Sequence, residues 1–218
     1  MSNGRLITIE GLDGAGKTTL ARELLQSITA AGVSRAQLLR EPGGVKLSER
    51  IRELVKDPAL TVGARTEALL YAAARAQLVD ELVAPLLREG CWVLLDRFID
   101  SSLAYQGAGR ELGIKDVLAI NLFATRGLVA DRTLLLRISP AMGRARQLQR
   151  ACEPDRLERE DERFFATIAE AYEDLARQEP ERVRVIDAEQ PPEFVLAQAQ
   201  QAIADMFSAE NAETQREL

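Results

Sequence analysis

Histidine is missing from all 218 residues of this chain, which removes the commonest general base and the commonest metal ligand of enzymes. Any chemistry must therefore rest on carboxylates, lysine, arginine or a hydrated metal ion. Cysteine is scarce too. Cys91 lies in an apolar, strand-like run and Cys152 in a charged segment, so the pair favours neither a disulfide framework nor a metal cluster. We expect a reducing compartment.

Long hydrophobic runs and an excess of positive charge are also lacking. No apolar run approaches the length of a membrane span, and the N-terminal MSNGRLITIEG has no hydrophobic stretch of the secretory kind, so we expect a cytoplasmic protein. The 28 basic and 34 acidic residues give a net charge of −6, which argues against binding to nucleic acid mainly by counterion release. Any anionic ligand must be met by local arginines.

What the sequence does contain is an alternation of short apolar runs with longer helical patterns. The strand-like runs are LITIE, AQLLRE, CWVLLD, RTLLLRI and RVRVID. Strands separated by helices predict an α/β fold with a parallel sheet covered by helices on both faces. With no repeat, linker or break in composition, we expect one domain over residues 1–207 and a polar, disordered tail over 208–218.

A glycine-rich turn follows the first strand and leads directly into the helical pattern TTLARELLQSITAAG. In IEGLDGAGKTTL the glycines allow the backbone to wrap around phosphate oxygens, Lys17 can reach the bridging and terminal phosphates, and the Thr18 hydroxyl can help to hold Mg²⁺. The alternative is a glycine-rich turn without a ligand. The predicted nucleotide-binding residues are Gly11, Leu12, Asp13, Gly14, Ala15, Gly16, Lys17, Thr18 and Thr19.

The acidic ligand of the metal should lie at the end of a neighbouring apolar strand, and CWVLLDRF places Asp96 there with Arg97 next to it. A structural ion pair is the alternative interpretation of this dipeptide. A GTPase would need an Asn-Lys-x-Asp segment that reads guanine, and the dipeptide NK does not occur. A small-molecule kinase is the economical hypothesis.

Five segments together carry a resemblance to a known family. EGLDGAGKTT, REPGG, YAAARAQ, LLDRFIDSSLAYQGAGR and DRLERED, in this order and spacing, resemble a bacterial thymidylate kinase from about Leu6 to about Met206. The resemblance implies a P-loop nucleoside monophosphate kinase fold with a five-stranded parallel sheet. It also implies transfer of the γ-phosphoryl group of ATP to thymidine monophosphate with Mg²⁺, for DNA precursor synthesis, and a homodimer.

The resemblance implies roles for residues on the acceptor side. Asp13 would read the sugar 3′-hydroxyl, Tyr71 would place its ring against thymine where many relatives have Phe, and Arg75 would bind a thymine carbonyl. Tyr71 and Arg75 are four residues apart on an alanine-rich helix and so share a face. The alternatives are a loop residue facing solvent, a core tyrosine and a solvated arginine.

Further acceptor-side roles follow from the same resemblance. Ser102 would lie near the base edge, and the ring of Tyr105 would fill the space of a ribose 2′-hydroxyl. Gln106 would line the pocket, Arg97 would grip the acceptor phosphate, and a turn containing Pro42 would shape the site. A helix cap is the alternative for Ser102.

The segment GRARQLQRACEPDRLERED predicts an arginine-rich lid at about residues 143–160. The phosphate loop has no arginine, so in this family the lid would supply the charge. Arg146 and Arg150 match the lid arginines, although RACEPDR is one residue longer than usual, and Arg156 could fix the lid through neighbouring carboxylates. A solvated helix face is the alternative for the whole run.

Two other functions stay open on the sequence alone. A nucleoside kinase would need a carboxylate base near the sugar, which Glu41 could supply, and a P-loop regulatory module would bind ATP without using an acceptor. A monophosphate acceptor needs no such base, which agrees with the lack of histidine. The apolar helix predicted at 66–87 is either wholly buried in its own domain or shared with a partner. We expect the adenine base to lie near residues 187–190.

Overall fold

In the computed structural model, which describes residues 4–149 and 154–207, the predicted strands form one parallel sheet in the order β2-β3-β1-β4-β5. The strands are β1 (Leu6–Gly11), β2 (Ala36–Arg40), β3 (Trp92–Asp96), β4 (Arg132–Arg137) and β5 (Val183–Asp187). This confirms the predicted α/β class and the five-stranded parallel sheet. The proposed tail at 208–218 lies outside the described residues.

The central strands are mostly apolar because both faces of the sheet are covered. All six residues of β1 are buried, and the side chains of Trp92 to Leu95 in β3 are fully inaccessible. β1 and β3 run in register, with Ile9 opposite Asp96, so the carboxyl ends of the two strands lie side by side. This register brings the glycine-rich turn after β1 next to the Asp-Arg pair at the end of β3.

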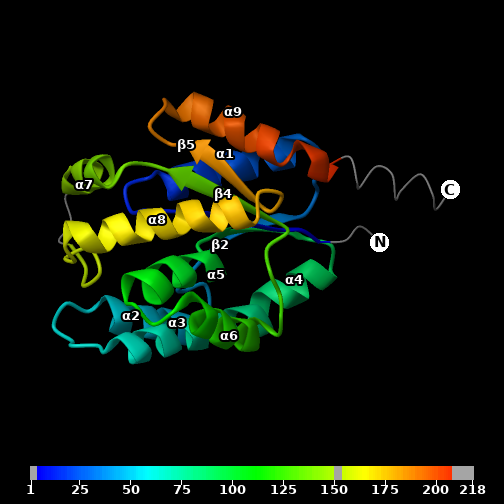
Figure 1. The fold of residues 1–218 in the computed structure, drawn as a ribbon. Helices are drawn as coiled ribbons and strands as arrows, with labels where there is room; N and C mark the ends of the chain where they lie inside the picture. The colour runs from blue at the N-terminus through cyan, green and yellow to red at the C-terminus, as the bar shows by residue number, and fades with distance from the viewer. Residues whose placement is uncertain (1–3, 150–153, 208–218) are drawn as a thin grey trace.

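Helices cover both faces of the sheet (Figure 1). α1 and α9 pack together on one face, and the other face carries α4, α5 and α8, with α2, α3 and α6 beyond them. The bounds are α1 (Lys17–Ala30), α2 (Lys46–Lys56), α3 (Ala64–Leu78), α4 (Ala84–Arg88), α5 (Ile99–Ser102), α6 (Ile114–Thr125), α7 (Pro140–Leu148), α8 (Glu162–Gln178) and α9 (Pro192–Ala202).

Two π-helical segments interrupt the expected α-helices. The predicted apolar helix at 66–87 is α3 followed by η1 (Val79–Val83) and α4, and the turn after α5 continues as η2 (Leu103–Gly109). Side-chain periodicity cannot distinguish these from α-helix, and π segments are frequent at functional sites. η2 carries Tyr105 and Gln106.

The layer formed by α2, α3 and α6 is not wholly covered by its own chain. α3 buries one side against its neighbours but leaves Leu69 57% exposed, and Phe123 at the end of α6 is 89% exposed. Leu47 and Leu54 of α2 are also exposed. The predicted apolar helix at 66–87 is therefore not wholly buried within the described chain, since Leu69 is exposed, and its sharing with a partner stays a prediction.

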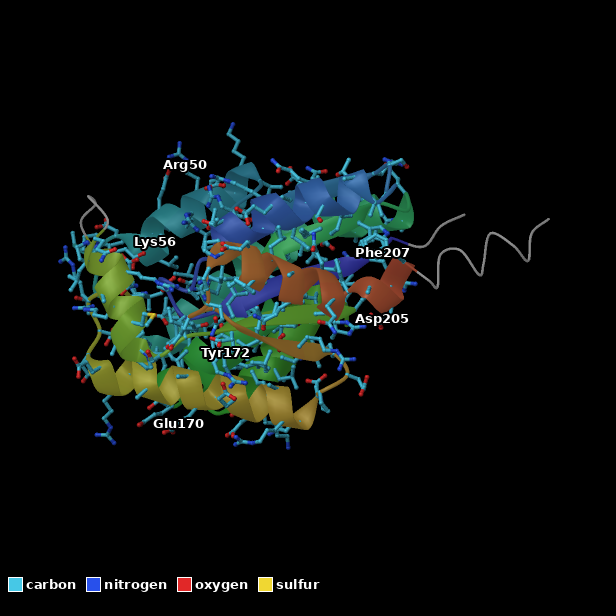
Figure 2. All side chains as sticks on the ribbon, turned by 90° about the horizontal axis from the view of Figure 1, so that it is seen from above. Arg50, Lys56, Glu170, Tyr172, Asp205 and Phe207 are labelled. Carbon is cyan, nitrogen blue, oxygen red and sulfur yellow. The ribbon has the colours of Figure 1, made fainter. Side chains whose placement is uncertain are left out.

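α8 carries both an outward and an inward face, as its strong amphipathic pattern requires. Figure 2 shows Glu170 on the outer side of α8 and Tyr172 pointing from the same helix into the interior, where its side chain is buried. Within residues 4–149 and 154–207, no helix combines the length and apolar character that crossing a membrane would require.

Candidate active site

The turn between β1 and α1 has the backbone shape that its glycines allow. Gly14 and Gly16 have φ values of 87° and 93°, in the left-handed region where glycine carries no steric cost, and α1 begins at Lys17. Lys17 Nζ donates hydrogen bonds to the carbonyl oxygens of Gly11 and Leu12, at 3.1 and 2.8 Å. Burial lowers the pKa of Lys17 to about 8, with Arg97 acting in the same direction. The turn thus holds the Lys17 side chain against its own backbone carbonyl groups.

Thr18 and Asp96 meet at the base of this turn, although 78 residues separate them. The Thr18 hydroxyl donates to Asp96 Oδ2 at 2.9 Å. One hydroxyl and one carboxylate are hard oxygen donors, which suits Mg²⁺, an ion that binds few protein ligands and takes the rest from phosphates and water. No cluster of three acidic, histidine or cysteine side chains able to hold a metal occurs among the described residues. The donor set therefore fits a nucleotide-bound magnesium ion.

Arg97 lies between the phosphate turn and the acceptor side of the site. Its φ of 72° is unusual for a residue with a side chain. Nη2 donates to Asp13 Oδ1 at 2.6 Å and to the Tyr105 hydroxyl at 3.3 Å. Burial opposes ionisation of Asp13, but Arg97 and Lys17 overcome this effect and hold the pKa of Asp13 well below its usual range. Asp13, Arg97 and Tyr105 thus form one hydrogen-bonded unit.

Glu10 supports the unit of Asp13, Arg97 and Tyr105 through Ser101. Its fully buried carboxylate accepts the backbone N–H of Phe98 at 2.7 Å, the hydroxyl of Ser101 at 2.5 Å and the hydroxyl of Tyr172 at 2.9 Å. Ser101 in turn accepts a hydrogen bond from Arg97 Nη1 at 3.1 Å. Burial raises the pKa of Glu10 to about 7, and the nearby Asp100 acts in the same direction.

One cavity extends from the phosphate turn to α2 and α3. The predicted acceptor-side residues all line it, together with the predicted metal ligands, Lys17 and two loop glycines. The predicted residues that it brings together are Asp13, Gly14, Gly16, Lys17, Thr18, Pro42, Tyr71, Arg75, Asp96, Arg97, Ser102, Tyr105 and Gln106. Tyr71 and Arg75 project from the same face of α3, as their spacing predicts.

Arg75 is the most buried arginine among the lining residues, with 2% of its surface exposed. Nε donates to Glu41 Oε2 at 2.7 Å, Nη1 to Ser102 Oγ at 2.9 Å and to Asn121 Oδ1, and Nη2 to the Phe98 carbonyl at 2.7 Å. Nη2 is also 2.6 Å from Glu41 Oε2. Protein acceptors thus hold the whole guanidinium group, and a base carbonyl would share one of its donors.

A second cavity lies on the other side of the phosphate turn. It is lined by Ala15, Gly16, Thr19, Leu20, Glu23, Arg146, Ala188, Gln190, Pro192 and Val195. Arg146 of α7 spans this cavity, because its Nη1 donates to the Ala188 carbonyl at 3.0 Å and lies 3.5 Å from the Gly14 carbonyl. Ala188 and Gln190 belong to the segment that the sequence predicts near the adenine base.

The structure divides the predicted lid residues. Arg146 lies beside the phosphate turn, and Arg156 reaches the acceptor-side helices, where its Nη2 donates to Glu67 Oε2 at 2.6 Å. Arg150 lies outside the described residues, and the remaining predicted loop residues Gly11 and Leu12 line a separate cleft between β4 and α8.

Several polar residues of the site were missed by the sequence analysis. Glu10 had a recognisable signal, since a charged residue in a buried strand needs partners. Glu67 and Asn121 had none, because glutamate in the first turn of a helix and asparagine on a helix face are ordinary. Their partners come from distant segments and exist only in the folded chain.

Comparisons with known proteins agree with this geometry. A family model described as thymidylate kinase matches residues 9–199. The thymidylate kinase of Lactobacillus delbrueckii subsp. bulgaricus is 45% identical over 206 residues, covering 94% of this chain and 97% of that protein. That of Deinococcus radiodurans is 44% identical over 205 residues, covering 94% and 98%. The crystal structure of thymidylate kinase from Ehrlichia chaffeensis superimposes with a TM-score of 0.75 at 27% identity, covering 93% of this chain and 99% of that one.

Proposed function

The chain belongs to the thymidylate kinase family and transfers the γ-phosphoryl group of ATP to thymidine monophosphate, and from this premise we propose how its residues divide the reaction. The observation that carries the proposal is that the phosphate loop and the predicted acceptor residues line one common cavity. A single P-loop kinase domain, with residues 143–160 as its lid, would thus hold donor and acceptor together. The product, thymidine diphosphate, serves DNA precursor synthesis.

The phosphate loop binds the triphosphate of ATP. Its backbone amides and the N-terminus of α1 present partial positive charge to the phosphates. Lys17 exchanges its contacts with the Gly11 and Leu12 carbonyls for phosphate oxygens. Thr18 and Asp96 would hold Mg²⁺, which would neutralise negative charge on the triphosphate.

The second cavity receives the adenine base. It adjoins the phosphate loop at Ala15 and Thr19 and is walled by Ala188 and Gln190 after β5. Arg146 lies across it, so its planar guanidinium can stack on the base while its charge stays close to the phosphates.

The acceptor cavity receives thymidine monophosphate. Arg97 grips the acceptor phosphate through its forked donors, and Asp13 accepts from the sugar 3′-hydroxyl. Tyr105 occupies the space of a ribose 2′-hydroxyl. The base lies against Tyr71 and Pro42, where Arg75, Ser102 and Gln106 contact its polar edge.

The transfer itself needs positioning and charge neutralisation. An oxygen of the acceptor phosphate is already anionic near neutral pH, so no residue has to remove a proton. As this oxygen bonds to the γ-phosphorus, the bond from that phosphorus to ADP breaks. Lys17 and Arg97 neutralise the transferring group from the loop and the acceptor side, and lid arginines Arg146 and Arg150 complete the positive surroundings.

The exposed surface and the composition support a proposal for assembly and location. The exposed apolar side chains of α2, α3 and α6, among them Leu69 and Phe123, suit a homodimer interface. The acidic net charge and the sparse cysteines suit a cytoplasmic enzyme that acts on small molecules and binds neither nucleic acid nor membrane.

The two alternatives from the sequence receive no support. The matched family consists of monophosphate kinases, so neither a nucleoside kinase nor a regulatory module describes the chain. Glu41, the base that a nucleoside kinase would require, is held by Arg75 at 2.7 Å from Nε.

The deciding experiment measures ADP release from ATP and Mg²⁺ with thymidine monophosphate, with thymidine and without acceptor, for the wild type and Arg97→Ala. We expect release only with the monophosphate, and a loss of about 100-fold in kcat/KM for Arg97→Ala, because a forked charged contact is removed. Arg177→Ala, on the exposed face of α8, serves as the control. Equal release with thymidine, or an unimpaired Arg97→Ala variant, would contradict the assignment.

A further inference from the structure

Glu67, in the first turn of α3, is a fully buried carboxylate that joins three segments of the chain. Its Oε1 accepts from Gln106 Nε2 at 2.9 Å and from Arg110 Nε at 3.3 Å. Its Oε2 accepts from Arg110 Nη2 at 3.2 Å and from Arg156 Nη2 at 2.6 Å. All of these partners offer only N–H donors, so the Glu67 carboxylate acts purely as a hydrogen-bond acceptor here.

This contact determines which way the Gln106 amide faces. Because Glu67 only accepts, the NH₂ group of Gln106 must point toward it and the carbonyl Oε1 must point the other way. Gln106 lines the acceptor cavity, and among the described residues no donor bonds its Oε1. The cavity is therefore offered an acceptor and not a donor at this position.

The C-terminal part of the predicted lid, from Asp155 to Glu160, is bound to the same carboxylate. Arg156 also donates from Nε to the Val55 carbonyl at 2.9 Å, and Lys56 Nζ is 2.5 Å from Asp155 Oδ2. Figure 2 shows Lys56 at the end of α2, from which it reaches this segment. Arg110, which is paired with Glu67, also forms an ion pair with Glu160 of this segment, with Nη1 2.7 Å from Glu160 Oε1. Arg156 itself does not line the acceptor cavity.

We propose that Glu67 is a positioning residue for base selectivity, which turns the Gln106 amide so that its oxygen faces the base, and that Arg156 keeps Glu67 in place from the lid side. The inference rests on the proposed acceptor site. Thymine presents an N–H at N3 that can donate to this oxygen, whereas cytosine presents a lone pair there and is repelled. The Glu67 carboxylate thus both binds the lid segment and orients the side chain that recognises the base.

The test uses Glu67→Gln, which keeps the shape but adds a donor. The amide oxygen of the new side chain should stay with Arg156, its shortest charged partner, so its NH₂ group would face Gln106. Gln106 must then turn its amide oxygen toward residue 67, and its NH₂ group would face the cavity. We expect the ratio of kcat/KM for thymidine monophosphate over deoxycytidine monophosphate to fall by about 10-fold or more.

A second substitution in the Glu67→Gln background separates orientation from damage. Adding Gln106→Glu restores an acceptor-only group at the cavity, because a carboxylate has no donor to present. Recovery of the ratio supports the proposal. A ratio that stays low in a double variant with a wild-type melting temperature would mean that Glu67→Gln only distorts the site, and would overturn it.

Arg156→Met tests the lid side without touching the cavity. We expect a smaller fall in the same ratio, about 3-fold or more, with the KM for thymidine monophosphate raised more than kcat is lowered. Arg159→Met is the matched control, since Arg159 is exposed and, among the residues that the structure describes, donates only to the Pro154 carbonyl of its own segment. An unchanged ratio in Arg156→Met would refute the part of the proposal in which Arg156 keeps Glu67 in place.

The wild type distinguishes the two levels of failure. If wild-type enzyme showed no preference for thymidine monophosphate over deoxycytidine monophosphate, the proposed acceptor site would be wrong. If the wild type prefers the thymine base and folded Glu67→Gln keeps that preference, the acceptor site stands and the role of Glu67 is refuted.

Discussion

Gly14 of the phosphate loop and Gly143 of α7 meet backbone against backbone. A Cβ atom on Gly14 would lie 2.4 Å from the Gly143 carbonyl oxygen, and one on Gly143 would lie 2.8 Å from the Asp13 carbonyl oxygen. Both distances are too short for a side chain unless the backbone shifts. The helix that carries Arg146 therefore rests directly on the loop proposed to hold the phosphates.

Replacing Gly143 with alanine tests this contact. Alanine is normally more favourable than glycine in a helix interior by about 1 kcal/mol, so the substitution should not destabilise the helix itself. The new methyl group should instead push α7 away from the loop. We expect kcat to fall by about 10-fold, from the displacement of Arg146. Steady-state kinetics with ATP varied would show it, and Ala141→Ser, exposed on the same helix, should stay close to wild type.

Tyr105 should decide between deoxyribose and ribose acceptors. Its ring is buried beside Arg97, with the guanidinium 5.0 Å from the ring centroid. Tyr105→Ala should raise the kcat/KM for ribothymidine monophosphate relative to the deoxy form by about 10-fold, because the space of the 2′-hydroxyl opens. Tyr105→Phe keeps the ring and should keep the discrimination. Equal ratios in both variants would place the sugar elsewhere.

Glu10 should make stability depend on pH. Its pKa is raised from 4.5 to about 7 by burial and by Asp100, so between these values the folded state binds a proton that the unfolded state has lost. Stability from this group is full below pH 4.5 and is lost as the pH rises through 7. We expect about 1–3 kcal/mol of stability lost between pH 5 and pH 8 in the wild type relative to Glu10→Gln. Urea unfolding at both pH values measures the difference, and parallel profiles would refute it.

The exposed apolar surface of α3 and α6 should hold two chains together. Leu69→Glu and Phe123→Glu each place a charge where a partner would bury an apolar side chain, so we expect the mass measured by light scattering to fall from dimer to monomer. Phe194→Glu, on α9 and 59% exposed, is the control and should leave the mass unchanged. A monomeric wild type would contradict the proposed assembly.

Much of the fold was readable from local patterns. Short apolar runs such as CWVLLD, placed between helical patterns, favour buried strands between helix layers, and each predicted run matches a strand of the sheet to within one residue at either end. The π-helical segments were not predictable, because they differ from α-helix by single inserted residues that leave the apolar pattern nearly unchanged.

The candidate site divides in the same way. Lys17 and Thr18 could be predicted from the sequence, because a phosphate loop is continuous in sequence and its chemistry needs glycines, an amine and a hydroxyl within a few residues. Glu67, Arg110 and Arg156 carry no such pattern, since a buried carboxylate finds its partners wherever the chain returns.

By itself the sequence determined the parallel α/β sheet, the nucleotide loop and the kinase family, because these depend on local periodicity and short motifs. Only the tertiary structure decided that Glu10 supports Arg97 through Ser101 and that Glu67 orients Gln106 while binding the lid segment. Those contacts join residues far apart in the chain, and hydrogen-bond geometry depends on distances that no linear spacing encodes.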